Sequence, residues 1–309
     1  MIVLPRSFAP LLPCQKPMTQ PISYTFPRYL AAKTSVDDRA LNKHVWQTLA
    51  MELPGASPQS PLRVLEIGAG IGTMAERLVN HNMLTHAVYT AVDEQADNIA
   101  TAQERLAALP TTVGLELETA DFYDYAARHS GQRQWDLLIA HAVLDLTDVG
   151  ATLPTLFDLL APGGLFYFSI NFDGATILQP TIDPTLDAKI EGLYHQTMDE
   201  RVVNGRLSGD SQTGRHLFHQ LRGAGGVILA AGGADWVVFA GENGAYPADE
   251  AYFLHFIVHT MYGALAGNPE LETAVFADWI AQRHAQIESG ELVYIAHQLD
   301  FLGRWPGKP

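Results

Sequence analysis

The chain has 309 residues, of which 47% are apolar and 17% charged, so it can bury a large core. Acidic residues outnumber basic ones by 34 to 19, and the net charge of −15 disfavours nucleic acid or an anionic membrane as a partner. There is one cysteine, Cys14, and no apolar stretch long enough to span a bilayer. These features predict a cytoplasmic protein without a disulfide.

The N-terminal region divides into two parts. Residues 1–22 are rich in proline, which predicts a poorly ordered tail. The segment SVDDRALNKHVWQTLAMEL then predicts an amphipathic helix that is capped by Ser35 and has Leu41, Val45 and Leu49 at four-residue steps. We therefore expect residues 1–60 to form a flexible tail and an N-terminal cap helix.

Strand and helix patterns alternate in the middle of the chain. Strands are predicted in RVLEIGAGIG, HAVYTAVD, VGLELETADF, WDLLIAHAVLDL and GGLFYFSINF. Helices are predicted between them in TMAERLVNHN, EQADNIATAQERLAAL and ATLPTLFDLLA. This alternation is typical of an α/β fold with a parallel sheet and crossover helices on both faces.

The second half is less regular. Residues 172–210 are polar and indicate a loop-rich insertion, followed by a helix in GRHLFHQLRGAG and a strand in GVILAAGGADWVVFA. Two helical patterns occupy residues 247–288, beginning at Pro247 and near Asn268, and ELVYIAHQLDFL reads as a late strand.

The sharpest local signal is the turn VLEIGAGIGT. Glycines at 68, 70 and 72 let the backbone bend tightly and approach a ligand, and the following helix offers free amide groups. Asp93 closes the next predicted strand, where a carboxylate can bind a ribose diol. The dinucleotide fingerprint fails because position 73 is Thr73 rather than glycine, so NAD is the second choice of ligand.

An acidic residue followed by G-x-G-x-G resembles the first motif of the class I S-adenosylmethionine-dependent methyltransferases. The resemblance continues through Asp93, the Ala120-Asp121-Phe122 segment, DLLIAHAVLDL and APGGLFYFS, and covers roughly residues 62–170. It implies a Rossmann-like, doubly wound sheet of seven strands, mostly parallel, with ELVYIAHQLDFL as an antiparallel last strand. The same resemblance implies that S-adenosyl-L-methionine is the cofactor and that residues 61–309 form the methyltransferase domain.

Family positions imply the role of each site residue. Glu66 orients the glycine turn, Asp93 holds the ribose, Asp121 binds the adenine amino group and Phe122 packs on its ring. The cofactor-binding set comprises Glu66, Gly68, Ala69, Gly70, Gly72, Thr73, Asp93, Glu94, Ala120, Asp121, Phe122, Ala140 and His141. The family motif [N/D]-P-P-[Y/F] of adenine and glutamine methylation is absent after the fourth strand, which argues against those acceptors.

The acceptor is expected under a cap formed by the N-terminal helix and the insertions at 172–210 and 241–290. Candidate acceptor-binding residues are Tyr29, Tyr194, Tyr252 and His255, although packing between helices also explains such aromatic residues. His141 and His195 are candidate bases because histidine titrates near neutral pH. His255 and His259 have metal-ligand spacing, but no third ligand is evident and no metal is expected.

Three functions remain in competition at this point. The first is methyl transfer to oxygen or nitrogen of a small molecule, and the second is an NAD(P)-dependent oxidoreductase. The third is a non-catalytic protein that binds S-adenosylmethionine. The sequence leaves the acceptor and the oligomeric state open.

Overall fold

The computed structural model describes residues 21, 23–203 and 205–308. Most of the proline-rich tail at 1–22, including Cys14, lies outside this part. The first half forms α1 (Phe26–Ala40), α2 (Lys43–Glu52), β1 (Leu62–Ile67), α3 (Thr73–Asn80), β2 (Ala87–Asp93), α4 (Ala96–Leu106), β3 (Val113–Thr119), α5 (Phe122–His129), β4 (Trp135–His141), the short 3-10 helix η1 (Leu144–Leu146) and α6 (Val149–Phe157). The second half forms β5 (Leu160–Gln179), α7 (Pro184–Asp199), β6 (Val202–Val203), β7 (Arg206–Leu207), α8 (Thr213–Gly223), β8 (Val227–Gly233), β9 (Trp236–Val238), α9 (Glu250–Leu265), α10 (Thr273–Glu288) and β10 (Val293–Arg304).

One large sheet organises the described chain, with the strand order β3-β2-β1-β4-β5-β10-β8. Neighbours from β3 to β5 pair in parallel, whereas β10 lies antiparallel between β5 and β8. The expected mostly parallel, seven-stranded path with an antiparallel last strand is confirmed, and the short β9 adds a further pairing with β10. The carboxyl ends of β1, β2 and β4 therefore meet at one edge, where open α/β sheets bind ligands.

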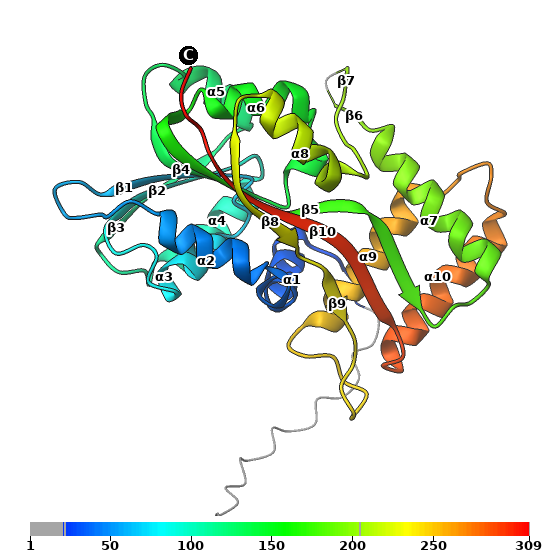
Figure 1. Ribbon diagram of the computed structural model, residues 1–309. Helices are drawn as coiled ribbons and strands as arrows, with labels where there is room; N and C mark the ends of the chain where they lie inside the picture. Colours follow the sequence, from blue (N-terminus) through cyan, green and yellow to red (C-terminus); the bar gives the residue numbers. More distant parts are fainter. Residues whose placement is uncertain (1–20, 22, 204, 309) are drawn as a thin grey trace, which may run out of the picture.

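Helices cover both faces of this sheet (Figure 1). On one face, α2, α3 and α4 bury side chains such as Leu49, Leu78 and Leu106 against alternate strand residues. On the other face, α5, α6 and α8 bury Tyr125, Leu156 and Leu221 against the intervening strand residues. The alternation follows from the two-residue period of a strand, which sends successive side chains to opposite faces.

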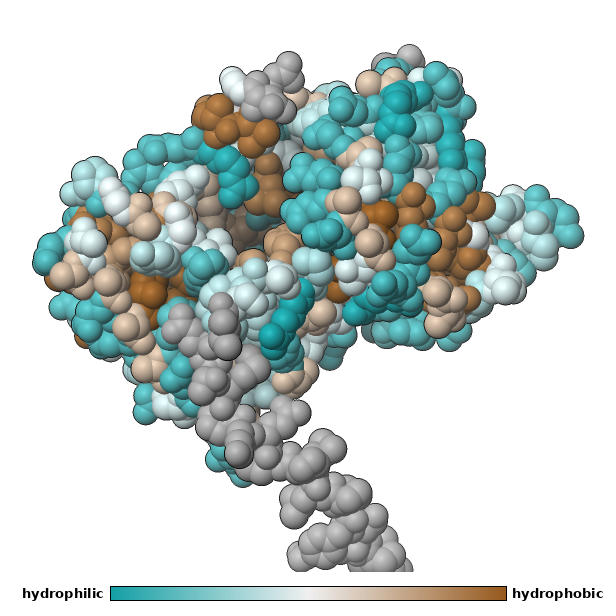
Figure 2. Space-filling model, turned by 180° about the vertical axis from the view of Figure 1, so that it is seen from behind, coloured by the Kyte–Doolittle hydropathy of each residue, from teal (hydrophilic) through white to brown (hydrophobic). Residues whose placement is uncertain are grey.

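A separate apolar core lies outside the parallel sheet. The strands β5 and β10 continue past the sheet edge as a long antiparallel pair that ends at Gln179 and Val293, and α7, α9 and α10 pack beside it (Figure 1). Helix α1 joins these elements through Ala32 and Val36, which are buried in the same core. The space-filling view shows the surface hollowed between this cap and the sheet domain (Figure 2).

The helix expected from Ser35 is wrong in its boundaries. Helix α1 starts earlier, at Phe26 with Pro27 in its first turn, and Ser35 lies in its middle. A second helix, α2, is capped by Asn42, whose side-chain oxygen accepts hydrogen bonds from the amides of His44 and Val45 at 3.1 Å. The chain turns there because the amide of Asn42 donates to Asp300 on β10 at 2.8 Å.

The loop-rich reading of 172–210 is also wrong. Strand β5 runs on to Gln179, and residues 184–199 form helix α7. Asp183 caps α7 by accepting hydrogen bonds from the amides of Thr185 and Leu186 at 2.9 and 2.8 Å, and Pro184 presets the first turn. The helix start signal was present in the sequence but was masked by the polar composition.

Three smaller differences concern element boundaries. WDLLIAHAVLDL ends as a strand at His141, because Ala142 takes a positive φ of 56° and the chain turns into η1. GVILAAGGADWVVFA divides into β8 and β9. Helix α5 follows β3 directly, although the sequence patterns did not predict it.

Candidate active site

The glycine turn has the backbone form that its residues require. Gly68, Gly70 and Gly72 all take positive φ values, of 60°, 55° and 81°. This left-handed region is open to glycine and strained for other residues. The turn leads into α3, whose first amides have no partner within the helix. Ala69 is buried, and the Thr73 hydroxyl accepts a hydrogen bond from Arg77 at 3.2 Å.

Asp93 reaches the glycine turn directly. One oxygen of its carboxylate accepts a hydrogen bond from the amide of Gly70 at 2.8 Å. The other accepts from the Gln95 amide at 2.9 Å and the Asn98 side chain at 3.0 Å. A carboxylate has about four acceptor positions, so these bonds leave room for one ribose hydroxyl rather than both. The neighbouring Glu94 is exposed.

Glu66 lies beneath the turn. Only 1% of it is exposed, and it accepts a hydrogen bond of 2.6 Å from the hydroxyl of Tyr89. Burial raises the pKa of Glu66 to about 8, against the opposing hydrogen bond from Tyr89. Glu66 is therefore a neutral acid at pH 7, which suits support of the turn better than an ionic contact with a cofactor.

The family's adenine-binding segment lies at the end of β3. Asp121 caps α5 by accepting hydrogen bonds from the amides of Tyr123 and Asp124 at 2.8 and 3.2 Å. Phe122 is half-buried, with its ring centroid 4.0 Å from that of Tyr123. The amide of Ala120 donates to the carbonyl of Asp93 at 3.0 Å, so this segment adjoins the end of β2.

Two apolar side chains lie against the glycine turn. A Cβ atom at Gly70 would lie 2.8 Å from Cδ1 of Leu30 on α1, and one at Gly68 would overlap a methyl group of Val143. The turn, Asp93 and the β3 segment suit an adenosine-containing group, but Leu30 and Val143 share the same space. A cofactor entering here would have to displace or repack them.

His141 ends β4 and joins a buried polar cluster with α1. Its Nε2 lies 3.0 Å from the Asp37 carboxylate and its Nδ1 lies 2.8 Å from the Ser169 hydroxyl. Asp37 also pairs with Lys33 and accepts a hydrogen bond from the indole of Trp236 at 2.9 Å. Ala140, one residue before His141, is fully buried.

Charge balance sets the protonation of this cluster. Burial alone would raise the pKa of Asp37, but Lys33 and the His141 hydrogen bond hold it well below its ordinary value. Burial and the charge of Lys33 lower the pKa of His141 to about 4, although Asp37 opposes this. His141 is thus neutral at pH 7. Its Nε2 donates to Asp37 and its Nδ1 accepts from Ser169, so neither nitrogen is free in this arrangement.

The second candidate base, His195, lies on a different element and contacts a different residue of β5. His195 on α7 bonds Thr176 through Nε2 at 3.0 Å, and burial lowers its pKa. His141 bonds Ser169 and His195 bonds Thr176, so the two candidate bases have different partners on β5.

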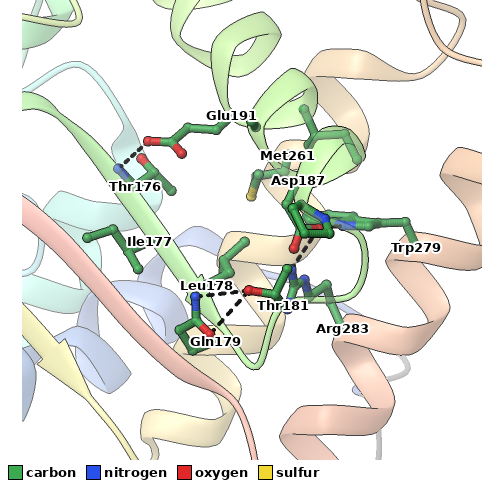
Figure 3. A pocket seen from close by; sticks show the side chains of 13 residues that line it. Thr176, Ile177, Leu178, Gln179, Thr181, Asp187, Glu191, Met261, Trp279 and Arg283 are labelled. Carbon is green, nitrogen blue, oxygen red and sulfur yellow. Dashed lines mark hydrogen bonds and ion pairs between the residues drawn. The ribbon is translucent and has the colours of Figure 1, made fainter.

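A cavity of about 240 Å³ lies still farther along β5, between α7, α9 and α10 (Figure 3). Asp187 lines this cavity and accepts a hydrogen bond from the indole of Trp279 at 2.6 Å. Arg283 lies 3.0 Å from the same carboxylate. Asp187 and Arg283, two charged side chains that line the cavity, are thus paired with each other.

The four candidate acceptor-binding residues separate into two pairs. Tyr29 and Tyr194 remain partly exposed and pack at the border of the cap core. Tyr252 is fully buried and accepts a hydrogen bond from the Thr25 amide at 2.9 Å. His255 is fully buried too, with its Nδ1 2.8 Å from that of His284. Tyr252 and His255 therefore belong to the cap core, as the packing explanation predicted.

Lys33 and Asp37 lie near the turn but had no assigned role from the sequence, whereas Tyr29 was a candidate acceptor-binding residue. Tyr29, Lys33 and Asp37 follow one another at four-residue steps on α1, which places them on one helix face. This polar stripe could have marked α1 as part of the site. Asp145, four residues after His141, is a further case, and one of its carboxylate oxygens is buried without a hydrogen-bond partner among the described residues.

A comparison with known protein families supports a methyltransferase rather than an oxidoreductase. Residues 65–166, which run from the glycine turn to β5, match a family described as a methyltransferase domain. Residues 65–166 therefore carry the signature of a methyltransferase domain. The expected resemblance to S-adenosylmethionine-dependent methyltransferases is thereby confirmed. A comparison with curated protein sequences finds no match.

Solved structures that are similar to this chain share low sequence identity with it. A cyclopropane synthase from Mycobacterium tuberculosis is 9% identical with a TM-score of 0.46, over 91% of this chain and 98% of that one. A phosphoethanolamine N-methyltransferase from Haemonchus contortus is 14% identical with a TM-score of 0.45, over 92% of this chain and 58% of that one. The [4+2]-cyclase SpnF is 15% identical with a TM-score of 0.45, over 92% and 95% of the two chains.

Proposed function

We propose that this methyltransferase transfers the methyl group of S-adenosyl-L-methionine to an oxygen or nitrogen atom of a small molecule. One observation carries the proposal. The Asp93 carboxylate at the end of β2 accepts a hydrogen bond from the Gly70 amide at 2.8 Å, which supports a shared role of this acid and the turn in holding a ribose-containing ligand. The net charge of −15 favours a small acceptor over nucleic acid, and we expect the protein to work in the cytoplasm.

The cofactor would be held by residues that surround the turn. In the proposed arrangement, the backbone of 68–73 receives the methionine part and Asp93 accepts one ribose hydroxyl, with Glu94 nearby. Ala120, Asp121 and Phe122 would border the adenine, and Ala140 and His141 would face the methionine from β4. When bound, the cofactor supplies a methyl group on a sulfonium, which is ready for in-line displacement.

The chain itself must align the acceptor and exclude water. Helix α1 suits this task because it lies over the ends of the strands, tied to α9 by Glu250, which bonds Arg39 at 2.5 and 2.8 Å and Ser35 at 2.7 Å. For a hydroxyl acceptor a base is also needed. We favour His141, which ends β4 beside the turn, over His195, which bonds Thr176. His141 could accept a proton at Nδ1 once Ser169 turns its hydroxyl away.

Calorimetry with S-adenosylhomocysteine tests the proposal. We expect binding at micromolar to millimolar concentration, and about tenfold weaker binding for Asp93→Asn because the ribose loses an ionic hydrogen bond. Asp97→Asn, an exposed position in the first turn of α4, is the matched control and should bind normally. Folded wild-type protein that binds no S-adenosylhomocysteine at millimolar concentration would overturn the proposal.

Two further assays separate the competing functions. A change in NAD(P)H absorbance on mixing with candidate substrates would instead support an oxidoreductase. Tight cofactor binding without methyl transfer to any member of a panel of alcohols, phenols and amines would support a non-catalytic binding protein.

A further inference from the structure

The cavity between β5, α7, α9 and α10 is large enough to hold a small organic molecule. Its volume is about 240 Å³, and side chains from all four elements line it (Figure 3). An engineered protein cavity of about 150 Å³ binds benzene. The cap cavity therefore has room for a benzene ring that carries a short substituent.

Apolar side chains form much of the cavity wall. Leu178 on β5, Ile190 on α7 and Met261 on α9 line it, and Trp279 on α10 adds an aromatic ring. Ile190, Met261 and Trp279 also belong to the buried cap core, so packing holds this wall in place. Small-molecule sites typically combine such a wall with a few polar groups that fix the orientation of the ligand.

Among the described residues, three charged side chains line the cavity: Asp187, Glu191 and Arg283. Two of them form an ion pair, because Arg283 lies 3.0 Å from the Asp187 carboxylate. The Arg283 guanidinium also donates a hydrogen bond to the carbonyl of Pro180 at 2.7 Å. The charges of Asp187 and Arg283 therefore balance each other, and Glu191 decides the sign of the charge that a ligand meets.

Glu191 has no ionic partner in the described part of the chain. One oxygen of its carboxylate accepts a hydrogen bond from the amide of Thr176 at 3.1 Å (Figure 3). The other oxygen accepts no hydrogen bond from a described residue, and the side chain is only partly buried. His195, four residues later on α7, bonds the Thr176 hydroxyl instead. One carboxylate oxygen at the cavity is thus open to a charged donor, which forms the stronger kind of hydrogen bond.

We propose that this cavity binds a small protonated amine with an apolar body. Its ammonium group donates to the second oxygen of Glu191, and its apolar part packs against Ile190, Met261 and Trp279. This site goes beyond the proposed function, because it uses neither the glycine turn nor His141 and requires no cofactor.

Three benzyl compounds of matched shape test the charge preference: benzylamine, benzyl alcohol and benzoate. Each is titrated by calorimetry into the full-length protein at neutral pH, without S-adenosylhomocysteine. We expect benzylamine to bind at least about tenfold more tightly than the other two. Glu191→Gln keeps an oxygen that can accept from the Thr176 amide, and it should bring benzylamine to the level of benzyl alcohol. Glu104→Gln, an exposed position on α4, is the matched control and should leave the preference intact.

A second pair of variants tests the location. Ala188 lines the cavity from an exposed position on α7, so Ala188→Phe should fill part of the space and weaken benzylamine at least about tenfold. Ala100→Phe, at an exposed position on α4, should bind benzylamine as the wild type does. Thermal unfolding of each variant checks that it is folded.

Four results would overturn the proposal. They are no binding of benzylamine at millimolar concentration, no preference for it, tighter binding of benzoate, and unchanged binding in folded Ala188→Phe. Tighter binding of benzoate would show that Arg283 rather than Glu191 governs the cavity. None of these results bears on the binding of S-adenosylhomocysteine, so the proposed function stands or fails separately.

Discussion

Asp37 on α1 accepts a hydrogen bond from His141 on β4, with 3.0 Å between Oδ2 and Nε2. This contact ties a helix near the start of the chain to the edge of the sheet where the cofactor is expected. Because Lys33 and Trp236 bind the same carboxylate, Asp37 joins α1, β4 and β9 at one point. Helix α1 is therefore part of the candidate site as well as part of the cap.

Replacing Asp37 should destabilise the protein strongly. Asp37→Asn leaves the buried Lys33 ammonium without its counter-ion, which typically costs about 3 kcal/mol or more in the free energy of unfolding. Denaturant unfolding measures the change. Glu118→Gln, which breaks an exposed pair with Arg128, is the control and should cost less than about 1 kcal/mol. Equal losses in the two variants would contradict the role of Asp37.

Gly70→Ala should weaken both folding and cofactor binding. Gly70 has a φ of 55°, and a Cβ there would lie 2.8 Å from Leu30. We expect a loss of about 1–2 kcal/mol in unfolding free energy from the backbone strain alone, and weaker binding of S-adenosylhomocysteine. Gly55→Ala is the matched control, because no atom lies within 4 Å of its Cβ position. Unchanged binding by Gly70→Ala would argue against the turn as the cofactor site.

Replacing Leu30 with a smaller residue should strengthen the binding of S-adenosylhomocysteine, whereas Gly70→Ala should weaken it. Leu30 lies on Gly70 in space that the proposed cofactor needs, so the free protein must move this side chain before binding. Leu30→Ala removes that step, and calorimetry should show several-fold tighter binding of S-adenosylhomocysteine. Met51→Ala, at an exposed position on α2, should change nothing. Weaker binding in Leu30→Ala would show instead that Leu30 contacts the cofactor.

Glu66 should make the free energy of unfolding depend on pH. Its pKa is raised by burial to about 8 in the folded protein, so the folded state holds a proton that the unfolded state has released above pH 4.5. This contribution is complete at low pH and is lost as pH rises from about 4.5 to 8. Glu66→Gln removes it, so the stability of the variant relative to wild type should rise over that range. If the free energies of unfolding of Glu66→Gln and wild type change equally with pH, the pKa of Glu66 is not raised.

Sequence patterns predicted the sheet well because they depend on neighbours along the chain. The strand ending at Glu66-Ile67, the positive-φ glycines and Asp93 follow from short-range rules of turns and strand ends. The alternation of strands and helices then predicted the parallel sheet, and the family resemblance implied the antiparallel last strand. The candidate cofactor set was named from the family resemblance, whose motifs lie at or just after the ends of the strands.

Tertiary structure alone decided the surroundings of those residues. Asp37 meets His141, and Tyr29 and Tyr294 both pack on Phe253, across separations in sequence that no periodic pattern records. The break between α1 and α2 depends on Asp300, more than two hundred residues away, and Tyr252 and His255 are buried because α9 packs on α1 and α10. The sequence by itself determined the class I core and its glycine turn. Long-range packing determined which side chains cover that turn, because Leu30 and Val143 reach it from other elements.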